Sequence, residues 1–178
     1  TGHSPNFWAR AMGWYGMALV DVLDYFPPNH PERKTLMAIL DRYAHAIRKV
    51  QDSETGLWWD VLNFPHRKAN YFEASGSCLF VYTLAKGVRR GWLPASYLSA
   101  AQKGYQGILR QFVGKDGNGR LSLKNTVSIS GLGGHPYRDG SYDYYISEKQ
   151  RLNDPGGVGA FLLGADEMDL LKTLLVGR

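Results

Sequence analysis

The sequence predicts an all-α fold in which helix pairs are arranged as part of a ring, and two observations lead to this prediction. A nearly apolar helical segment is followed by an amphipathic one, then by a glycine-containing turn and a short extended piece. The same order occurs a second time, with Gly56 and Gly119 at matching points of the two turns. Repetition of a helical pair is typical of arrays and toroids of helix pairs.

The first unit begins with Ser4 and Pro5, which are favoured at the N-cap and the first position of a helix. Residues 7–26 are nearly all apolar or small, which indicates an inner helix buried on most of its surface, and a Pro-Pro pair ends it. Residues 31–51 carry apolar side chains at every third or fourth position, so an amphipathic outer helix is expected. After the turn, residues 57–61 are consistent with a short strand.

The second unit repeats this order and a third one begins after a long loop. An inner helix is expected over residues 71–87, an outer helix over 94–113 and an extended piece over 121–123. The loop over about residues 128–155 is rich in Gly, Tyr and Asp, and ordered loops of this length are usually functional. Residues 156–165 are then apolar or small, and 166–175 are more polar.

Three helix pairs would make only half of a closed ring of six pairs. An open half-ring would leave its inner helices exposed to water. We therefore expect that further chain on the N-terminal side, or a second chain, completes the ring.

Composition and charge exclude some classes of partner. The formal net charge is +5, but the basic residues are scattered, so a nucleic-acid partner is not expected. A mild positive balance favours an acidic ligand, although a solvated basic surface is the simpler explanation. The sequence has no apolar run of 18 residues, so no membrane span is expected. Cys78 is the single cysteine, which is compatible with a reducing compartment, and we expect a cytoplasmic location.

Arg10 is the most prominent candidate for binding chemistry. It lies on the most apolar segment of the chain, and Trp14 follows four residues later on the same helical face. A guanidinium matches a carboxylate in bidentate fashion, and an indole face can pack against a sugar ring. Arg10 and Trp14 are therefore candidates for binding a uronate. The alternative is a core arginine in an internal ion pair beside a core tryptophan.

Further binding candidates lie in the glycine-rich late loop. His135, Arg138 and Tyr142 are here, on a segment whose glycines let the backbone approach a ligand closely. The alternative is that Asp139 belongs to a turn and that Arg138 anchors the loop. Neither reading is preferred by the residues alone.

Two acidic residues elsewhere are weaker candidates, and no metal or cofactor site is expected. Glu73 begins an inner helix, where capping is a simpler role than chemistry. Asp60 follows two tryptophans, and the sequence does not decide whether it faces a cavity or solvent. The histidines show no spacing typical of metal ligands, and the chain has no phosphate-binding loop.

Five segments in order resemble one known family. They are residues 7–15, 52–58, 70–77, 131–145 and 157–163. These segments are similar to motifs of glycoside hydrolase family 105, the unsaturated rhamnogalacturonyl hydrolases. The resemblance covers nearly the whole chain and implies an (α/α)6 barrel. Residues 1–178 would be the C-terminal portion of this single domain, with about half of the barrel present.

The resemblance also implies an activity. Members of the family act on short pectin fragments with an unsaturated uronate at the non-reducing end. An acid protonates the C4=C5 double bond, water adds at C5, and the resulting hemiketal collapses and releases the next sugar. The usual spacing rule for the two carboxylates of glycosidases therefore does not apply. The family uses an aspartate as general acid and no metal or other cofactor.

The family resemblance places the general acid before the first residue of this chain. No catalytic residue is therefore expected here, whereas Arg10 and Trp14 match residues that line the family's substrate site. The partner implied is a small oligosaccharide with an unsaturated uronate. The alternative is a truncated toroid without activity that acts as a sugar-binding or scaffold module.

Overall fold

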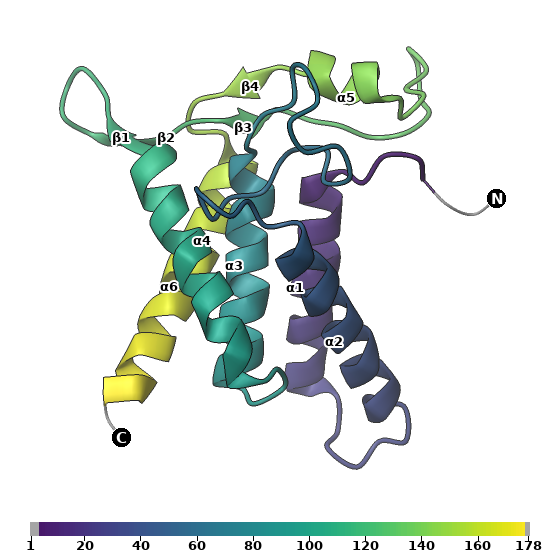
Figure 1. Cartoon of the computed structure of the whole chain (residues 1–178), viewed down its shortest axis with the longest axis vertical. Helices are drawn as coiled ribbons and strands as arrows, with labels where there is room; N and C mark the ends of the chain where they lie inside the picture. Colours follow the sequence, from purple (N-terminus) through teal and green to yellow (C-terminus); the bar gives the residue numbers. More distant parts are fainter. Residues whose placement is uncertain (1–3, 177–178) are drawn as a thin grey trace.

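The computed structural model describes residues 4–176 and consists mainly of five long helices (Figure 1). These are α1 (Ala9–Tyr25), α2 (Arg33–Lys49), α3 (Ala74–Arg89), α4 (Leu98–Gln111) and α6 (Pro155–Val176). Shorter elements are the 3-10 turn η1 (Ala95–Tyr97), α5 (Tyr142–Ser147), β1 (Val113–Lys115), β2 (Leu121–Leu123), β3 (Thr126–Val127) and β4 (Gln150–Arg151). β1 pairs antiparallel with β2, and β3 pairs antiparallel with β4.

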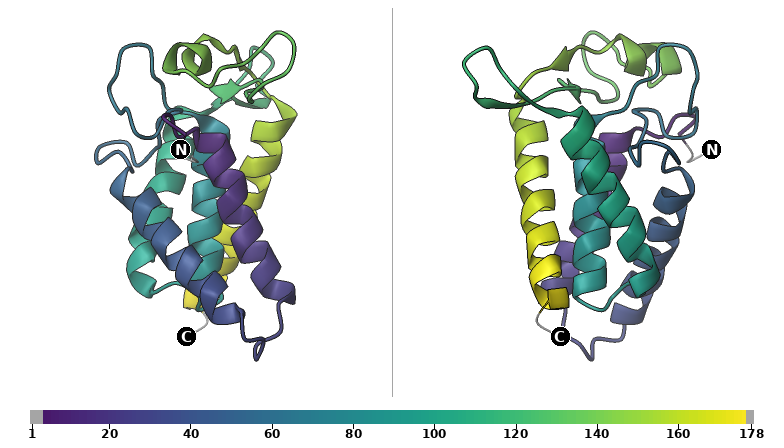
Figure 2. Two further views of the ribbon diagram at one scale, coloured as in Figure 1. Left: turned by 90° about the vertical axis from the view of Figure 1, so that its right-hand side faces the viewer. Right: turned by 60° about the vertical axis from the view of Figure 1, so that its left-hand side comes forward.

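The central helix of the molecule is α3. It packs against α1, α4 and α6, and every residue from Ala74 to Gly87 is buried. α1, α3 and α6 all begin at the end of the molecule that carries β3, β4 and α5, whereas α2 and α4 run in the opposite direction (Figure 1). The left view of Figure 2 shows α2 and α4 on one side of the bundle and α6 on the other. The alternation of inner and outer helices predicted from the sequence is therefore present.

The prediction that the first helix begins at Ser4 and Pro5 is wrong. α1 begins at Ala9, and no side chain caps it. The preceding residues are extended because they pair with another segment: the N–H of Phe7 donates to Asn63 Oδ1, and its carbonyl accepts from the N–H of Leu62. Pairing between distant segments outweighs the local capping preference here.

The third unit also differs from the expected helix pair. Residues 155–176 form the single continuous helix α6, so an outer helix paired with it is not among the described residues. Most polar residues after position 165 lie on the exposed side of the same helix, whereas Glu167 is buried and pairs with Arg89 of α3. Within residues 4–176, no helix combines the length and apolar character needed to cross a membrane.

Two of the inner helices expose apolar side chains along their outer edges. Nothing within residues 4–176 covers these faces of α1 and α6. The exposed apolar residues are Trp14, Tyr15, Val22 and Tyr25 on α1 and Leu162, Leu163, Leu170 and Leu174 on α6. A row of inner helices that is open at both ends is the arrangement expected for part of a ring.

Glycines allow the inner helices to pack closely. A Cβ added to Gly76 on α3 would lie 2.7 Å from the Cβ of Ala9 on α1, which is closer than real Cβ contacts. A Cβ on Gly164 of α6 would lie 3.0 Å from the carbonyl oxygen of Cys78 on α3. The small residues of the inner segments thus set the short distances between these helices.

We predict that Gly76→Ala lowers the free energy of unfolding by about 1–3 kcal/mol, because the added methyl group forces α1 away from α3. Gly159→Ala on α6 is the matched control, since nothing lies within 4 Å of its added Cβ. The control should be neutral or more stable by up to about 1 kcal/mol. Urea unfolding of both variants tests this, and equal effects would show that the close approach of α1 and α3 is not a constraint.

Candidate functional site

Three extended segments meet at the loop-bearing end of the inner helices and place several polar side chains together. The N–H of Ala9 donates to the carbonyl of Asp60 at 2.8 Å, and the N–H of Asp60 donates to the carbonyl of Tyr71 at 2.8 Å. The bridges Trp8–Val61 and Trp59–Phe72 belong to the same arrangement. The short strand predicted over residues 57–61 is therefore an extended middle segment with isolated bridges on both sides.

The guanidinium of Arg10 lies at the centre of this region and is buried. Its Nε donates to Ser75 Oγ at 2.7 Å, Nη1 donates to the carbonyl of Ser128 at 3.3 Å, and Nη2 donates to the carbonyl of Val127. Nη2 also lies 3.8 Å from Glu73 Oε1. Arg10 thus ties α1 to the start of α3 and to β3. Its pairing with Glu73 is the internal ion pair that the sequence left open as an alternative.

Glu73 caps α3, as expected, and is fully buried. Its carboxylate accepts from the backbone N–H groups of Ser75 at 3.2 Å and Gly76 at 2.6 Å, from Ser75 Oγ, and from the N–H of Val127 at 3.1 Å. With Arg10 beside it, this carboxylate has a complete set of donors. Its charge is therefore compensated within the protein.

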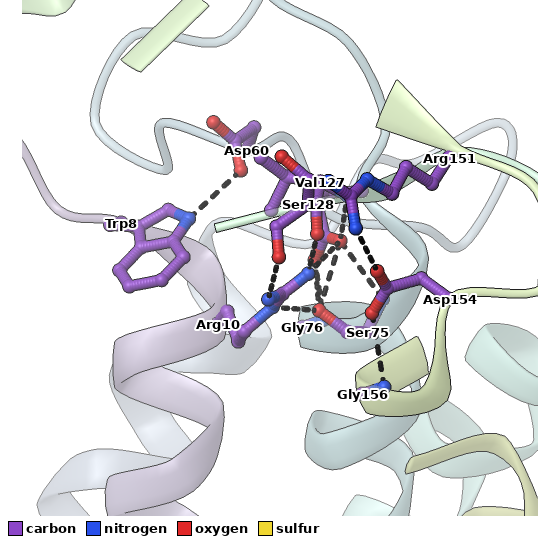
Figure 3. A network of polar contacts seen from close by, with 11 residues as sticks. Trp8, Arg10, Asp60, Ser75, Gly76, Val127, Ser128, Arg151, Asp154 and Gly156 are labelled. Atoms are coloured by element: carbon purple, nitrogen blue, oxygen red, sulfur yellow. Dashed lines mark hydrogen bonds and ion pairs between the residues drawn. The ribbon is translucent and has the colours of Figure 1, made fainter. Parts of the chain in front are cut away.

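Asp60 is fully buried, which settles the question of whether it faces solvent. Its Oδ1 accepts from the indole Nε1 of Trp8 at 3.2 Å, and its Oδ2 has no partner among the described residues (Figure 3). Burial, and secondarily the negative charge of Glu73, raises the pKa of the Asp60 carboxyl well above its usual range. Burial therefore shifts the ionisation equilibrium of this carboxyl toward its protonated form.

Trp8 joins this group although it was not among the sequence candidates. The ring is half-buried, stacks on Tyr145 with a centroid distance of 6.1 Å, and lies 5.7 Å from the guanidinium carbon of Arg10. Trp14 lies one helical turn after Arg10 and is 41% exposed. Trp8 was visible in the sequence only as a neighbour of Arg10, because its pairing with Asp60 depends on the contact between distant segments.

The late-loop candidates His135 and Arg138 lie together at a second place. They line a surface hollow of about 370 Å³, together with Pro136, Tyr137, Tyr144 and Glu148. Arg138 Nε donates to the carbonyl of Gly133 at 3.0 Å, so its guanidinium folds back on its own loop. An ion pair anchoring Arg138, one of the sequence alternatives, is not present among residues 4–176.

Tyr142 is buried, and its hydroxyl donates to the carbonyls of Lys68 at 2.9 Å and Arg67 at 3.2 Å. The guanidinium carbon of Arg67 lies 3.8 Å from the ring centroid. Tyr142 therefore holds the loop before α3 against α5. Its predicted role in substrate binding stays a prediction.

The five predicted binding residues do not form one contact group. The structure brings His135 and Arg138 into one hollow and places Arg10 in a buried network that shares no residue with that hollow. Trp14 and Tyr142 belong to neither group. Among residues 4–176, no group of three His, Cys, Asp or Glu residues is arranged to hold a metal ion.

The fold and sequence are similar to those of known glycoside hydrolases. The solved structure of a family 105 glycoside hydrolase from C. acetobutylicum is 46% identical and superposes with a TM-score of 0.92, covering 95% of this chain and 47% of that protein. Protein Atu3128 of Agrobacterium fabrum is 35% identical over 96% of this chain and 75% of its own length. The unsaturated 3S-rhamnoglycuronyl hydrolase of an Alteromonas species is 27% identical over 92% of this chain and 35% of its own length.

The chain spans about half the length of the solved structure from C. acetobutylicum. The family model described as Glycosyl Hydrolase Family 88 matches residues 1–172. Together with the likeness to the family 105 structure, this match confirms the resemblance seen in the sequence motifs. The chain is therefore a member of the glycoside hydrolase group formed by families 88 and 105.

Proposed function

We propose that this chain forms the substrate-binding half of an enzyme that hydrolyses short pectin-type oligosaccharides ending in an unsaturated uronate. The family match over residues 1–172 is the observation on which this proposal depends. The relative from Alteromonas, named an unsaturated 3S-rhamnoglycuronyl hydrolase, supports the substrate class. Hydration of the C4=C5 double bond is the reaction we propose.

The end of the molecule that carries the loops is suited to an acidic sugar. The N-terminal ends of α1, α3 and α6 meet there, and helix N-termini favour negative charge. Arg10 uses one hydrogen on each of its three nitrogens for internal partners, so the second hydrogens of Nη1 and Nη2 remain for a ligand. The Trp8 ring beside it and the exposed ring of Trp14 are aromatic surfaces on which a sugar can pack.

The remaining half of the barrel is part of the same proposal. The exposed apolar faces of α1 and α6 are the edges to which further inner helices would be joined, and the C. acetobutylicum relative is about twice as long as this chain. We propose that the general acid is supplied by that half. Arg10, Trp14, His135, Arg138 and Tyr142 remain proposed binding residues.

Hydrolysis of unsaturated galacturonyl-rhamnose tests the function, followed by the loss of the ultraviolet absorbance of the double bond. We expect turnover by a protein that joins this chain to the preceding half of the barrel and none by the 178-residue chain alone. Turnover by the chain alone would contradict our placement of the acid and make Asp60 the first residue to replace. If neither protein is active but both bind the sugar, a binding module becomes the better description.

A role for Trp14 is tested by Trp14→Ala, with Val22→Ala as the control on the same helix. In the 178-residue chain, Trp14 and Val22 are similarly exposed, at 41% and 46%, so neither replacement should disturb its core. We expect Trp14→Ala to raise the Kd for the unsaturated disaccharide about tenfold, or ~1.4 kcal/mol, with no change for the control. Titration calorimetry gives both values, and equal affinities for the two variants would remove Trp14 from the site.

A further inference from the structure

Asp60 is a buried acid whose presence needs a reason beyond packing. Its side chain is fully buried, and it forms no ion pair within residues 4–176. Burying a carboxyl group without full hydrogen bonding costs free energy, and an apolar residue of similar size would avoid this cost. The single hydrogen bond that Asp60 makes through its side chain is therefore informative, and its donor is Trp8.

We propose that Asp60 is a positioning residue for substrate binding, because its carboxyl group fixes the indole of Trp8 beside Arg10. This inference rests on the proposed function, since it assumes that the Trp8–Arg10 surface receives the sugar. Asp60 acts through Trp8 and makes no contact with the substrate itself.

Trp8 is held in two independent ways. Its N–H donates to Asp60 Oδ1 at 3.2 Å, and one face of its ring stacks on Tyr145 at an interplanar angle of 27°. Backbone pairing on both sides of Asp60 fixes the acceptor, because Asp60 bonds to Ala9 and to Tyr71 at 2.8 Å each. An aromatic ring that is already held in its binding orientation loses little conformational entropy when a ligand packs on it.

The groups around Asp60 favour the protonated acid. Arg10 is the nearest cation, but its guanidinium is bonded to Ser75 and to two carbonyls and lies beside Glu73. The other titratable groups that face Asp60 are Glu73 itself and the phenols of Tyr71, Tyr142 and Tyr145, none of which supplies a positive charge. The hydrogen bond from Trp8 and the charge of Arg10 lower the pKa of Asp60, but both effects are smaller than that of burial.

Protonation of Asp60 has a consequence for stability. The pKa of this carboxyl is higher in the folded than in the unfolded protein, so the folded state binds more protons between these two values. The free energy of unfolding therefore falls as the pH rises through this window.

We expect Asp60→Asn to remove that loss of stability, so that the variant gains stability relative to the parent protein as the pH rises above about 4, the ordinary pKa of an aspartate. Asp139→Asn is the control, because Asp139 is exposed and backbone hydrogen bonding lowers the pKa of its carboxyl. Thermal unfolding at a series of pH values gives the comparison. A parallel pH dependence in the parent protein and Asp60→Asn would show that the pKa of Asp60 is the same in the folded and unfolded states, and it would overturn the protonated acid.

The positioning role is tested by a double-mutant cycle in the 178-residue chain. Asp60→Leu removes the acceptor, Trp8→Phe removes the donor but keeps a ring, and Asp60→Asn keeps an acceptor oxygen. We expect each of the first two to raise the Kd for unsaturated galacturonyl-rhamnose about tenfold, the double variant to be no worse than either, and Asp60→Asn to bind within about twofold of the parent chain. Effects that multiply in the double variant would overturn the proposal.

The indole N–H resonances separate this proposal from the proposed function. Trp8→Phe identifies the Trp8 resonance by its loss, and we expect Asp60→Leu to shift that resonance while the other four tryptophans keep theirs. If the parent chain binds no unsaturated uronate but the Trp8 resonance shifts, the proposed function fails and the contact of Asp60 with Trp8 stands. An unshifted Trp8 resonance overturns the positioning role, whatever the chain binds.

Discussion

A buried guanidinium requires hydrogen-bond acceptors, and the loop end of this molecule depends on meeting that requirement for Arg10 with one acceptor for each of its three nitrogens. Its partners come from the start of α3 and from β3, which are 65 and 117 residues away along the chain. Removing one partner of such a group leaves an uncompensated buried charge, which typically costs about 3–5 kcal/mol. The network therefore fixes where the long loop after α4 returns to the helices, and with it the position of α5 and the late-loop hollow.

The same requirement explains why the N-terminal segment is extended rather than helical. Arg10 reaches Ser75 because Ala9 pairs with Asp60 and Gly76 lies against Ala9. A helix that began at Ser4 would remove the backbone groups that pair with residues 60 and 62. The cap at Glu73 and the backbone pairing at Ala9 thus belong to one hydrogen-bond network. In it, backbone groups and buried charged side chains meet one another's hydrogen-bonding requirements.

The sequence predicted the helices well and the site only in part. Apolar periodicity found the inner and outer helices because burial acts residue by residue along one element. It placed Arg10 on an inner helix and recognised Glu73 as a cap, since both signals are local. It did not predict the hydrogen bond between Trp8 and Asp60, and it did not predict that Arg10 and Arg138 lie at different sites. Both features depend on which distant segments of the chain pair. The polar residues after position 165 were ambiguous for the same reason, since an exposed edge and an outer helix have similar composition.

The charge balance of the buried network limits how a uronate can be recognised. The negative charge of Glu73 already compensates the positive charge of Arg10, so this pair alone offers an incoming carboxylate little net electrostatic attraction. An ionised Asp60 would make the group negative overall and repel the substrate, whereas a protonated Asp60 leaves it neutral. The remaining positive potential comes from the N-terminal ends of α1, α3 and α6 and from the unused hydrogens of Arg10. The raised pKa of Asp60 therefore fits the proposed binding of an acidic sugar at this end of the molecule, because a protonated acid adds no negative charge beside Arg10 and Glu73.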